Sequence, residues 1–181
     1  IVAGLGLDRT EEGKILLTIQ VVEPAAIQST ASKNGKGNGS QHKPVFVVSY
    51  EGETVSEAVR GVLAIADKKM FFSTAQVLIL GERLLQDGIE EVLDFFQREN
   101  EMDYGMDILV AKDVTPKEIL EIETDIDSIP ALYIKGTIDN TNLRGTVKKT
   151  ILIDLLKDIG GSGIAPVIGG ISIAGEKEVR T

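Results

Sequence analysis

Acidic side chains are the groups in this sequence best placed to do chemistry, because several of them lie one or two residues apart. These groups are Glu11 with Glu12, Glu90 with Glu91, Glu99 with Glu101 and Asp103, and Glu121 with Glu123 and Asp125. Two carboxyl groups act as general acid and general base only where different environments separate their pKa values. All of these residues lie in polar segments or on the polar side of predicted helices, which favours solvated surface residues. A hydrolase that uses Glu90 and Glu91 is one alternative.

Nucleophiles and metal ligands of the usual kinds are scarce. The chain has no cysteine and a single histidine, His42, at the edge of a polar stretch. One histidine without cysteine does not make an ordinary zinc site, and no serine lies in the G-x-S-x-G turn of a hydrolase. The sequence therefore predicts a protein that is not an enzyme, with no catalytic residue, no cofactor site and no metal site.

Three glycine patterns resemble phosphate-binding turns. Gly4-Leu5-Gly6 leads into a predicted hairpin and so lacks the helix whose N-terminus would bind a phosphate. The glycines from Gly160 to Gly163 follow a predicted helix and precede a proline, which indicates a helix end. Gly81-Glu82-Arg83 does lie at a strand-to-helix turn, where open sheets bind ligands. This turn, or a pocket near Phe71 and Phe72, is where a small-molecule site is expected if there is one.

Composition limits the classes of partner. The 181 residues carry 28 acidic and 19 basic side chains, for a net charge of −9. Binding to nucleic acid or to anionic lipid depends on an excess of Lys and Arg, so this balance argues against both. No apolar run approaches the length of about 20 residues that spans a bilayer. With 43% hydrophobic residues, the chain is long enough for one well-packed domain.

The elements that would position these residues are organised around the stretch from Gln76 to Lys112. The apolar runs 76–81 and 108–111 are typical of strands that are covered on both faces. Between them, apolar residues at spacings of three and four predict one helix, with the stripe Leu85, Ile89, Val92, Leu93 and Phe96. Two strands joined in this way are expected to be parallel neighbours. The predicted fold class is α/β (α+β), with a mixed sheet, a central parallel strand-helix-strand unit and flanking helices.

The remaining segments add strands and helices around this unit. A hairpin is predicted from strands 1–8 and 14–22, with Ile15, Leu17, Ile19 and Val21 on its better-buried face and Thr18 and Gln20 on the other. Further strands are predicted at 44–50, 146–149 and 167–173, and helices after Thr54, after Thr115, from Pro130 and over 151–159. Phe71 and Phe72 are both expected in the core. The Gly/Ser/Lys-rich stretch 25–43 is predicted to be a flexible surface loop.

The two ends of the sequence suggest a longer polypeptide. The chain begins without methionine inside the predicted strand that starts at Ile1, and the last strand leads towards Thr181. We therefore expect residues 1–181 to be one domain of a longer protein, with any targeting signal upstream of Ile1.

Several colinear segments resemble the N-terminal domain of the Ger(x)C family, the C subunits of spore germinant receptors. They are Gly6-Leu7-Asp8 with Gly13-Lys14, Leu17 to Val22 with Pro24, Gly52 to Arg60, Phe72-Ser73 with Val77 to Glu82, Gly88-Ile89 with Leu93-Asp94-Phe95 and Arg98, Val110-Ala111-Lys112, and Asp154-Leu155-Leu156 with Gly163 and Pro166-Val167. Their order and spacing cover nearly the whole chain. The long loop between Pro24 and Pro44 departs from the family pattern, as does Thr74, which stands where many relatives are expected to have histidine.

The resemblance implies a lipoprotein subunit of a membrane-bound receptor. A secretory signal would end in a lipidated, for instance palmitoylated, cysteine upstream of Ile1, on the extracytoplasmic face of the spore inner membrane. The integral-membrane A and B subunits of the germinant receptor would be the partners. The function implied is a non-enzymatic scaffold or interaction domain needed for nutrient-triggered germination, and a module that binds the small-molecule germinant is the alternative.

Overall fold

The computed structural model describes residues 1–23, 45–66, 70–99, 101–122, 129–145, 147–161, 165–174 and 178–180. The predicted loop 25–43 and the single histidine, His42, lie outside these described residues.

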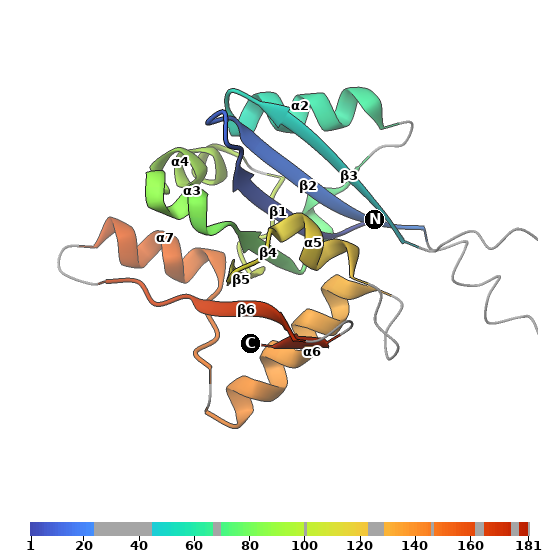
Figure 1. The fold of residues 1–181 in the computed structure, drawn as a ribbon. Coiled ribbons are helices and arrows are strands. Elements are labelled where there is room, and N and C mark those ends of the chain that lie inside the picture. Colours follow the sequence, from blue (N-terminus) through green and yellow to red (C-terminus); the bar gives the residue numbers. More distant parts are fainter. Residues whose placement is uncertain are drawn as a thin grey trace, which may run out of the picture.

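A seven-stranded mixed sheet forms the centre of the molecule, in the order β3-β2-β1-β4-β5-β6-β7. Figure 1 shows this order from β3 near the top to β6 near the bottom. The strands are β1 (Val2–Arg9), β2 (Ile15–Val22), β3 (Val45–Gly52), β4 (Val77–Leu80), β5 (Asp107–Ala111), β6 (Gly169–Ala174) and β7 (Glu178–Arg180). Strands β1, β4, β5 and β6 are parallel, and the other pairings are antiparallel. The predicted fold class and the central parallel unit are confirmed.

The first three strands form an antiparallel meander. Gly13, at the polar turn between β1 and β2, has φ +84°, a left-handed conformation that glycine adopts without strain. Arg9 then pairs with Ile15, and the register continues along the hairpin to a bulge between Val2 and Gly4. The predicted hairpin is thus confirmed.

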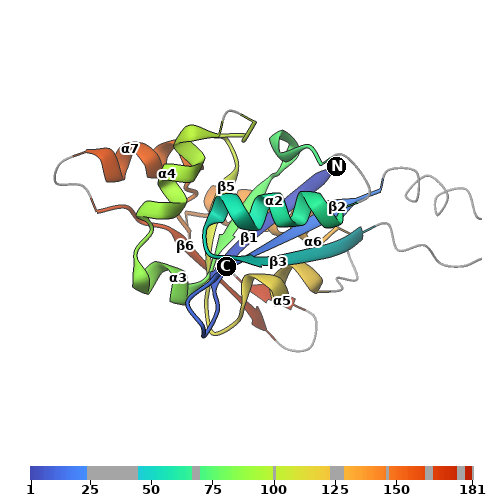
Figure 2. The same cartoon turned by 90° about the horizontal axis from the view of Figure 1, so that it is seen from above.

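Helices α2 (Val55–Ile65), α3 (Glu82–Asp87), α4 (Glu90–Arg98) and α7 (Leu152–Gly160) cover one face of the sheet. In Figure 1, α3 and α4 lie together above α7, and Figure 2 shows the same helices from above. The core on this face joins apolar residues of all four helices to alternate residues of the strands, such as Leu5, Leu78 and Ile108. Thr54 caps α2 by accepting a hydrogen bond from the Glu57 N–H, as the sequence predicts.

Helices α5 (Pro116–Glu121) and α6 (Pro130–Leu143) cover the other face. Thr115 and Glu118 form the predicted capping box at the start of α5. Glycines on β1 allow both helices to pack closely, because a Cβ at Gly6 would lie 2.8 Å from the Pro116 Cβ of α5 and one at Gly4 would lie 2.9 Å from the Ala131 Cβ of α6. The Gly4-Leu5-Gly6 pattern is therefore explained by close helix packing.

The prediction of a single helix between β4 and β5 is wrong. It is divided into α3 and α4 at Gly88, which has φ +109°. A left-handed residue cannot continue a right-handed helix, so the chain turns there and begins again at Glu90.

Two further expectations fail for reasons of packing. Phe72 is 5% exposed, as expected of a core residue, but Phe71 is 51% exposed. The predicted strand 146–149 is absent from the described residues 147–149. The chain pairs with the start of β5 only just after this segment, where Ile151 makes an isolated bridge with Asp107.

The expectation of a less buried face on β2 is also wrong. Gln20 is fully buried, since its amide donates to the Leu120 carbonyl (2.6 Å) and accepts from the Ala131 N–H (3.0 Å). Thr18 is buried as well, and its hydroxyl lies 3.0 Å from that of Ser49. Both faces of β2 are covered, and the polar residues of one face bind the ends of helices α5 and α6 and the neighbouring strand.

Within the part of the chain that the structure describes, no helix combines the length and the apolar character needed to cross a bilayer.

Candidate functional site

The carboxyl ends of the parallel strands β1, β4 and β5 lie at one end of the sheet. The chain moves outward from β1 through β2 to β3, then returns to place β4 on the other side of β1. In open α/β sheets, ligands bind where the order of the strands reverses in this way. The end of β1 at Asp8 and Arg9 and the turn after β4 at Gly81 meet at this point, since the Gly81 N–H donates to the Leu7 carbonyl.

Asp8 occupies the crevice between the two strand ends. It is 9% exposed, and a Cβ on Gly81 would lie 1.9 Å from its Oδ1. The glycine is therefore required for the carboxyl group to fit. Oδ1 accepts a hydrogen bond from the Arg9 N–H (2.8 Å). Burial raises the pKa of the Asp8 carboxyl above 3.8, against the opposing effects of that hydrogen bond and of the Arg83 charge.

Arg9 joins the hairpin turn to α3 and α4. Its Nε lies 3.2 Å from the Asp87 carboxylate, and its Nη2 lies 3.6 Å from the Glu91 carboxylate. Its Nη1 donates to the Gly13 carbonyl at 2.7 Å. A single guanidinium thus contacts three segments.

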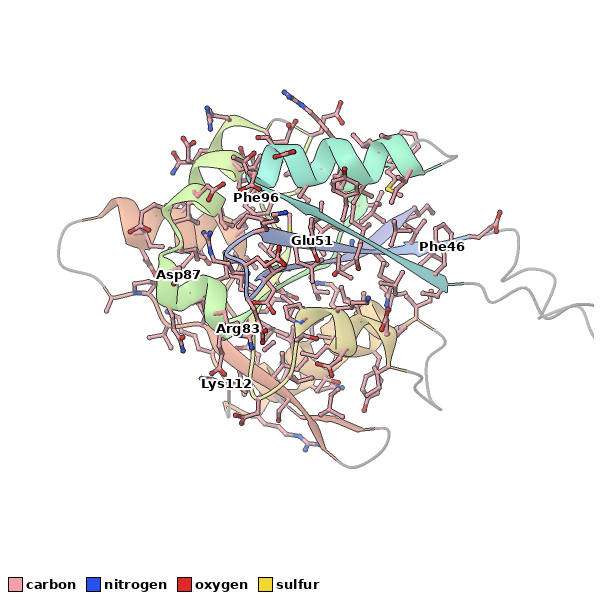
Figure 3. All side chains as sticks on the ribbon, turned by 45° about the horizontal axis from the view of Figure 1, so that its top comes forward. Phe46, Glu51, Arg83, Asp87, Phe96 and Lys112 are labelled. Atoms are coloured by element: carbon pink, nitrogen blue, oxygen red, sulfur yellow. The ribbon has the colours of Figure 1, made fainter. Side chains whose placement is uncertain are left out.

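Two exposed ion pairs extend this cluster. Arg83 lies 3.3 Å from Glu11, and Lys112 lies 2.6 Å from Glu82. The hydrogen bond from Lys112 lowers the pKa of Glu82 and raises that of Lys112. Figure 3 shows Arg83, Asp87 and Lys112 along one side of the molecule. We call the whole group, Asp8, Arg9, Glu11, Glu82, Arg83, Asp87, Glu91 and Lys112, the carboxyl-end cluster.

A shallow cleft of about 320 Å³ opens within this cluster. Its lining residues are all polar: Arg9, Thr10, Glu11, Arg83, Gln86 and Asp87. Arg9 and Arg83 already have carboxylate partners, so the cleft offers hydrogen bonds and balanced charge at an exposed surface. Such a surface is suited to polar contacts with a partner molecule.

The predicted candidate residues are partly brought together here. Glu82 and Arg83 belong to the carboxyl-end cluster, Gly81 lies against the Asp8 carboxyl, and Glu91 contacts Arg9. Glu90 is exposed, whereas Phe72 is buried in the core on the α2 face. Among the described residues, no group of three or more His, Asp or Glu side chains is arranged to hold a metal ion.

A second charged group at the opposite end of the parallel strands was not predicted. Asp107, at the start of β5, is 1% exposed and lies 3.2 Å from the Lys135 Nζ and 3.4 Å from the Lys149 Nζ. Lys149 also binds Asp139 at 2.5 Å, which lowers the pKa of that carboxyl. We call these four residues the amino-end cluster. The available signal was a charged residue directly before the apolar run Ile108 to Ala111.

Thr74 forms a local structural contact. Its hydroxyl lies 2.7 Å from the Val2 carbonyl and 2.8 Å from the Phe71 carbonyl. It therefore fixes the 3-10 turn η1 (Phe72–Thr74) against the first strand.

Comparisons with known proteins give the family. The chain is 29% identical over 178 residues to spore germination protein KC of Bacillus subtilis, and the match covers 97% of this chain and 43% of that protein. It is 26% identical over 145 residues to the putative spore germination protein YfkR of the same organism, covering 80% of this chain and 37% of the relative. The chain thus spans about two fifths of the length of these relatives. No solved structure matches it. The family model for the spore germination protein N-terminal domain matches residues 1–173, and the chain therefore belongs to this family, which connects it with spore germination.

Proposed function

We propose that this chain is a non-enzymatic interaction domain of a membrane-bound spore germinant receptor. The match of the family model to residues 1–173 carries the proposal, because it covers every strand that the structure describes except β7 and the end of β6. In this proposal residues 1–181 are a single N-terminal domain of a longer lipoprotein. A lipidated cysteine upstream of Ile1 anchors it to the outer face of the spore inner membrane.

The proposed partners are the integral-membrane A and B subunits. One acyl chain alone holds a protein at a membrane only marginally, so protein contacts are expected to add to the anchor. The carboxyl-end cluster is the proposed contact surface. Its exposed Arg83, Lys112, Glu11 and Glu82 offer charges of both signs to a partner.

Co-isolation of the membrane subunits tests this proposal. A full-length protein with Arg83→Glu and Lys112→Glu is expected to recover less of the A and B subunits, because both side chains are more than half exposed and can change without loss of the fold. Lys117→Glu on α5 is the matched control, since Lys117 is also exposed and also faces a carboxylate, that of Glu121. Equal recovery with the domain deleted would remove the proposal.

A small-molecule binding module is the second candidate. The position of the cleft beside Arg9 and Arg83, at the reversal of strand order, favours it. Thermal unfolding in the presence of amino acids, sugars and nucleosides tests this function. A true ligand at 100 times its Kd adds about 2.7 kcal/mol of stability. A gain that is retained in Arg83→Ala and Gln86→Ala variants would place the ligand elsewhere.

A further inference from the structure

Strand β3 forms one lateral edge of the sheet. It pairs with β2 along its whole length, from Val45 opposite Val22 to Gly52 opposite Ile15, and is the outermost strand in the order. Figure 1 shows it at the margin of the sheet beside α2. Among the described strands, none pairs with its outer side. The outward backbone groups of β3 therefore have no partner strand among the described residues, and groups of this kind can pair with a further strand.

The sequence of β3 lacks the features that usually protect such an edge. Natural edge strands are short, carry lysine or proline, or contain a bulge that turns the edge away. Strand β3 has eight residues, none of them Lys or Pro, and its register with β2 is uninterrupted. Its only charged residue is Glu51, next to the end. An edge of this kind is suited to pairing.

Aromatic side chains on one face add to this suitability. Phe46, Val48 and Tyr50 alternate along the strand and so share a face. It is the face that α2 covers, because the Tyr50 ring lies over Gly61 of α2, where a Cβ would approach within 2.1 Å. Phe46 and Tyr50 are each 38% exposed, and Val48 packs partly against the core. The Tyr50 ring is therefore held against α2, and both rings remain partly open to a neighbour.

We propose that β3 pairs with β3 of a second copy of this chain, antiparallel and with its twofold axis at Val48. This register is chosen by the pattern of the strand: it places Phe46 of each copy opposite Tyr50 of the other, and Val47 opposite Ser49. Aromatic pairs directly opposite each other stabilise antiparallel strands, and a twofold contact uses the same surface on both copies. Between Phe46 and Tyr50 no charged residue lies opposite another. The pairing joins two sheets into one.

This inference goes beyond the proposed function and does not depend on it. It also predicts a direction for the effect of salt. Each copy carries a net charge of −9, so the copies repel each other at long range, and salt screens that repulsion. Association is expected to strengthen as salt rises, whereas a contact built on ion pairs would weaken.

Disulfide trapping tests the register, since the chain has no cysteine of its own. In Val48→Cys the two thiols lie directly opposite each other, at a Cα separation of about 5 Å that a disulfide bridges. In the matched variant Ser49→Cys the two Cα atoms lie about 8 Å apart, beyond that reach. Under mild oxidation we expect Val48→Cys to form a disulfide-linked dimer, whereas Ser49→Cys should associate without forming the disulfide. Equal trapping of the two variants would overturn the register.

Sedimentation over a range of concentrations tests the association itself. Phe46→Lys removes both aromatic pairs of the dimer and is expected to weaken dimerisation roughly tenfold. Leu63→Lys is the control: it makes the same change of charge at an exposed apolar residue of α2, two residues from Gly61 and so on another side of the helix. A monomer at all concentrations, with no disulfide formed by Val48→Cys, would overturn the proposal. The expected partner of β3 would then be a strand of another protein. Recovery of the A and B subunits would be unaffected by that outcome, so the two proposals fail separately.

Discussion

The two ends of the parallel strands hold charge in different ways. At the amino end, the buried carboxylate of Asp107 lies between Lys135 and Lys149. At the carboxyl end, pairs such as Arg83 with Glu11 lie largely in water. Attraction between charges is stronger where water is excluded and is screened at the surface. The comparison indicates that the amino-end cluster contributes to stability, whereas the carboxyl-end cluster remains available for contacts.

The largest effect is expected at Asp107. Asp107→Asn keeps the shape of the side chain but leaves the ammonium groups of Lys135 and Lys149 without their buried partner. We expect the free energy of unfolding to fall by about 2–4 kcal/mol, somewhat less than for a fully buried pair because both lysines are partly exposed. Urea unfolding measures this loss. Asp94→Asn, at an exposed pair with Arg98, is the control, and an equal loss there would break the comparison.

The next effect concerns close packing at the carboxyl end. Gly81→Ala places a methyl group against the Asp8 carboxyl, which must move, and is expected to cost about 1–2 kcal/mol. In an Asp8→Ala background the same substitution should cost much less, because the obstructing group is gone. A double-mutant cycle by urea unfolding measures the coupling. Additive effects would show that Gly81 is not needed to accommodate Asp8.

A smaller effect of pH is expected at Asp8 itself. Its folded pKa is raised by burial, so the native state binds this proton more tightly than the unfolded chain. The stability from this group is present below pH 3.8 and is lost as the pH rises through the folded pKa. Asp8→Asn removes that loss, so the stability of the variant relative to the wild type should increase as the pH rises from 4 to 7. A constant difference across this range would contradict the sign.

The smallest effect is expected at Glu82. Its pKa is lowered by the hydrogen bond from Lys112, so the pair stabilises the native state above the usual pKa of Glu and loses this effect as the pH falls. The pair is exposed, and we expect Glu82→Gln to leave the urea midpoint unchanged at high salt. A clear shift of the midpoint that persists at high salt would show that this end, too, depends on its charges for stability.

Sequence patterns predicted the elements that local chemistry specifies. Thr115 and Glu118 marked the start of α5, Pro130 the start of α6, and unbroken apolar runs the strands β4 and β5. These signals lie within a few residues of the structure that they describe. They also placed Gly81 at the end of a strand, where the carboxyl-end cluster is found.

Contacts between distant residues could not be predicted in this way. Gln20 has the polar character of a surface residue, yet it binds main-chain atoms of Leu120 and Ala131, about 100 and 111 positions away. The spacing of apolar residues on either side of Gly88 is that of one continuous helix. In the structure, the positive φ of Gly88 divides this segment into two helices. The ion pairs of Asp107 could not be predicted either, since nothing near Asp107 in the sequence indicates that Lys135 and Lys149 contact it.

The sequence by itself determined the alternation of strands and helices, the hairpin, the helix caps and the acidic character, because each depends on neighbours along the chain. The tertiary structure alone decided which polar groups are buried and which charges meet, because those depend on the order of strands in the sheet and on which helices cover each face. Asp8 illustrates both: its place at the end of an apolar strand is local, but its crevice exists only because Gly81 of another strand ends beside it.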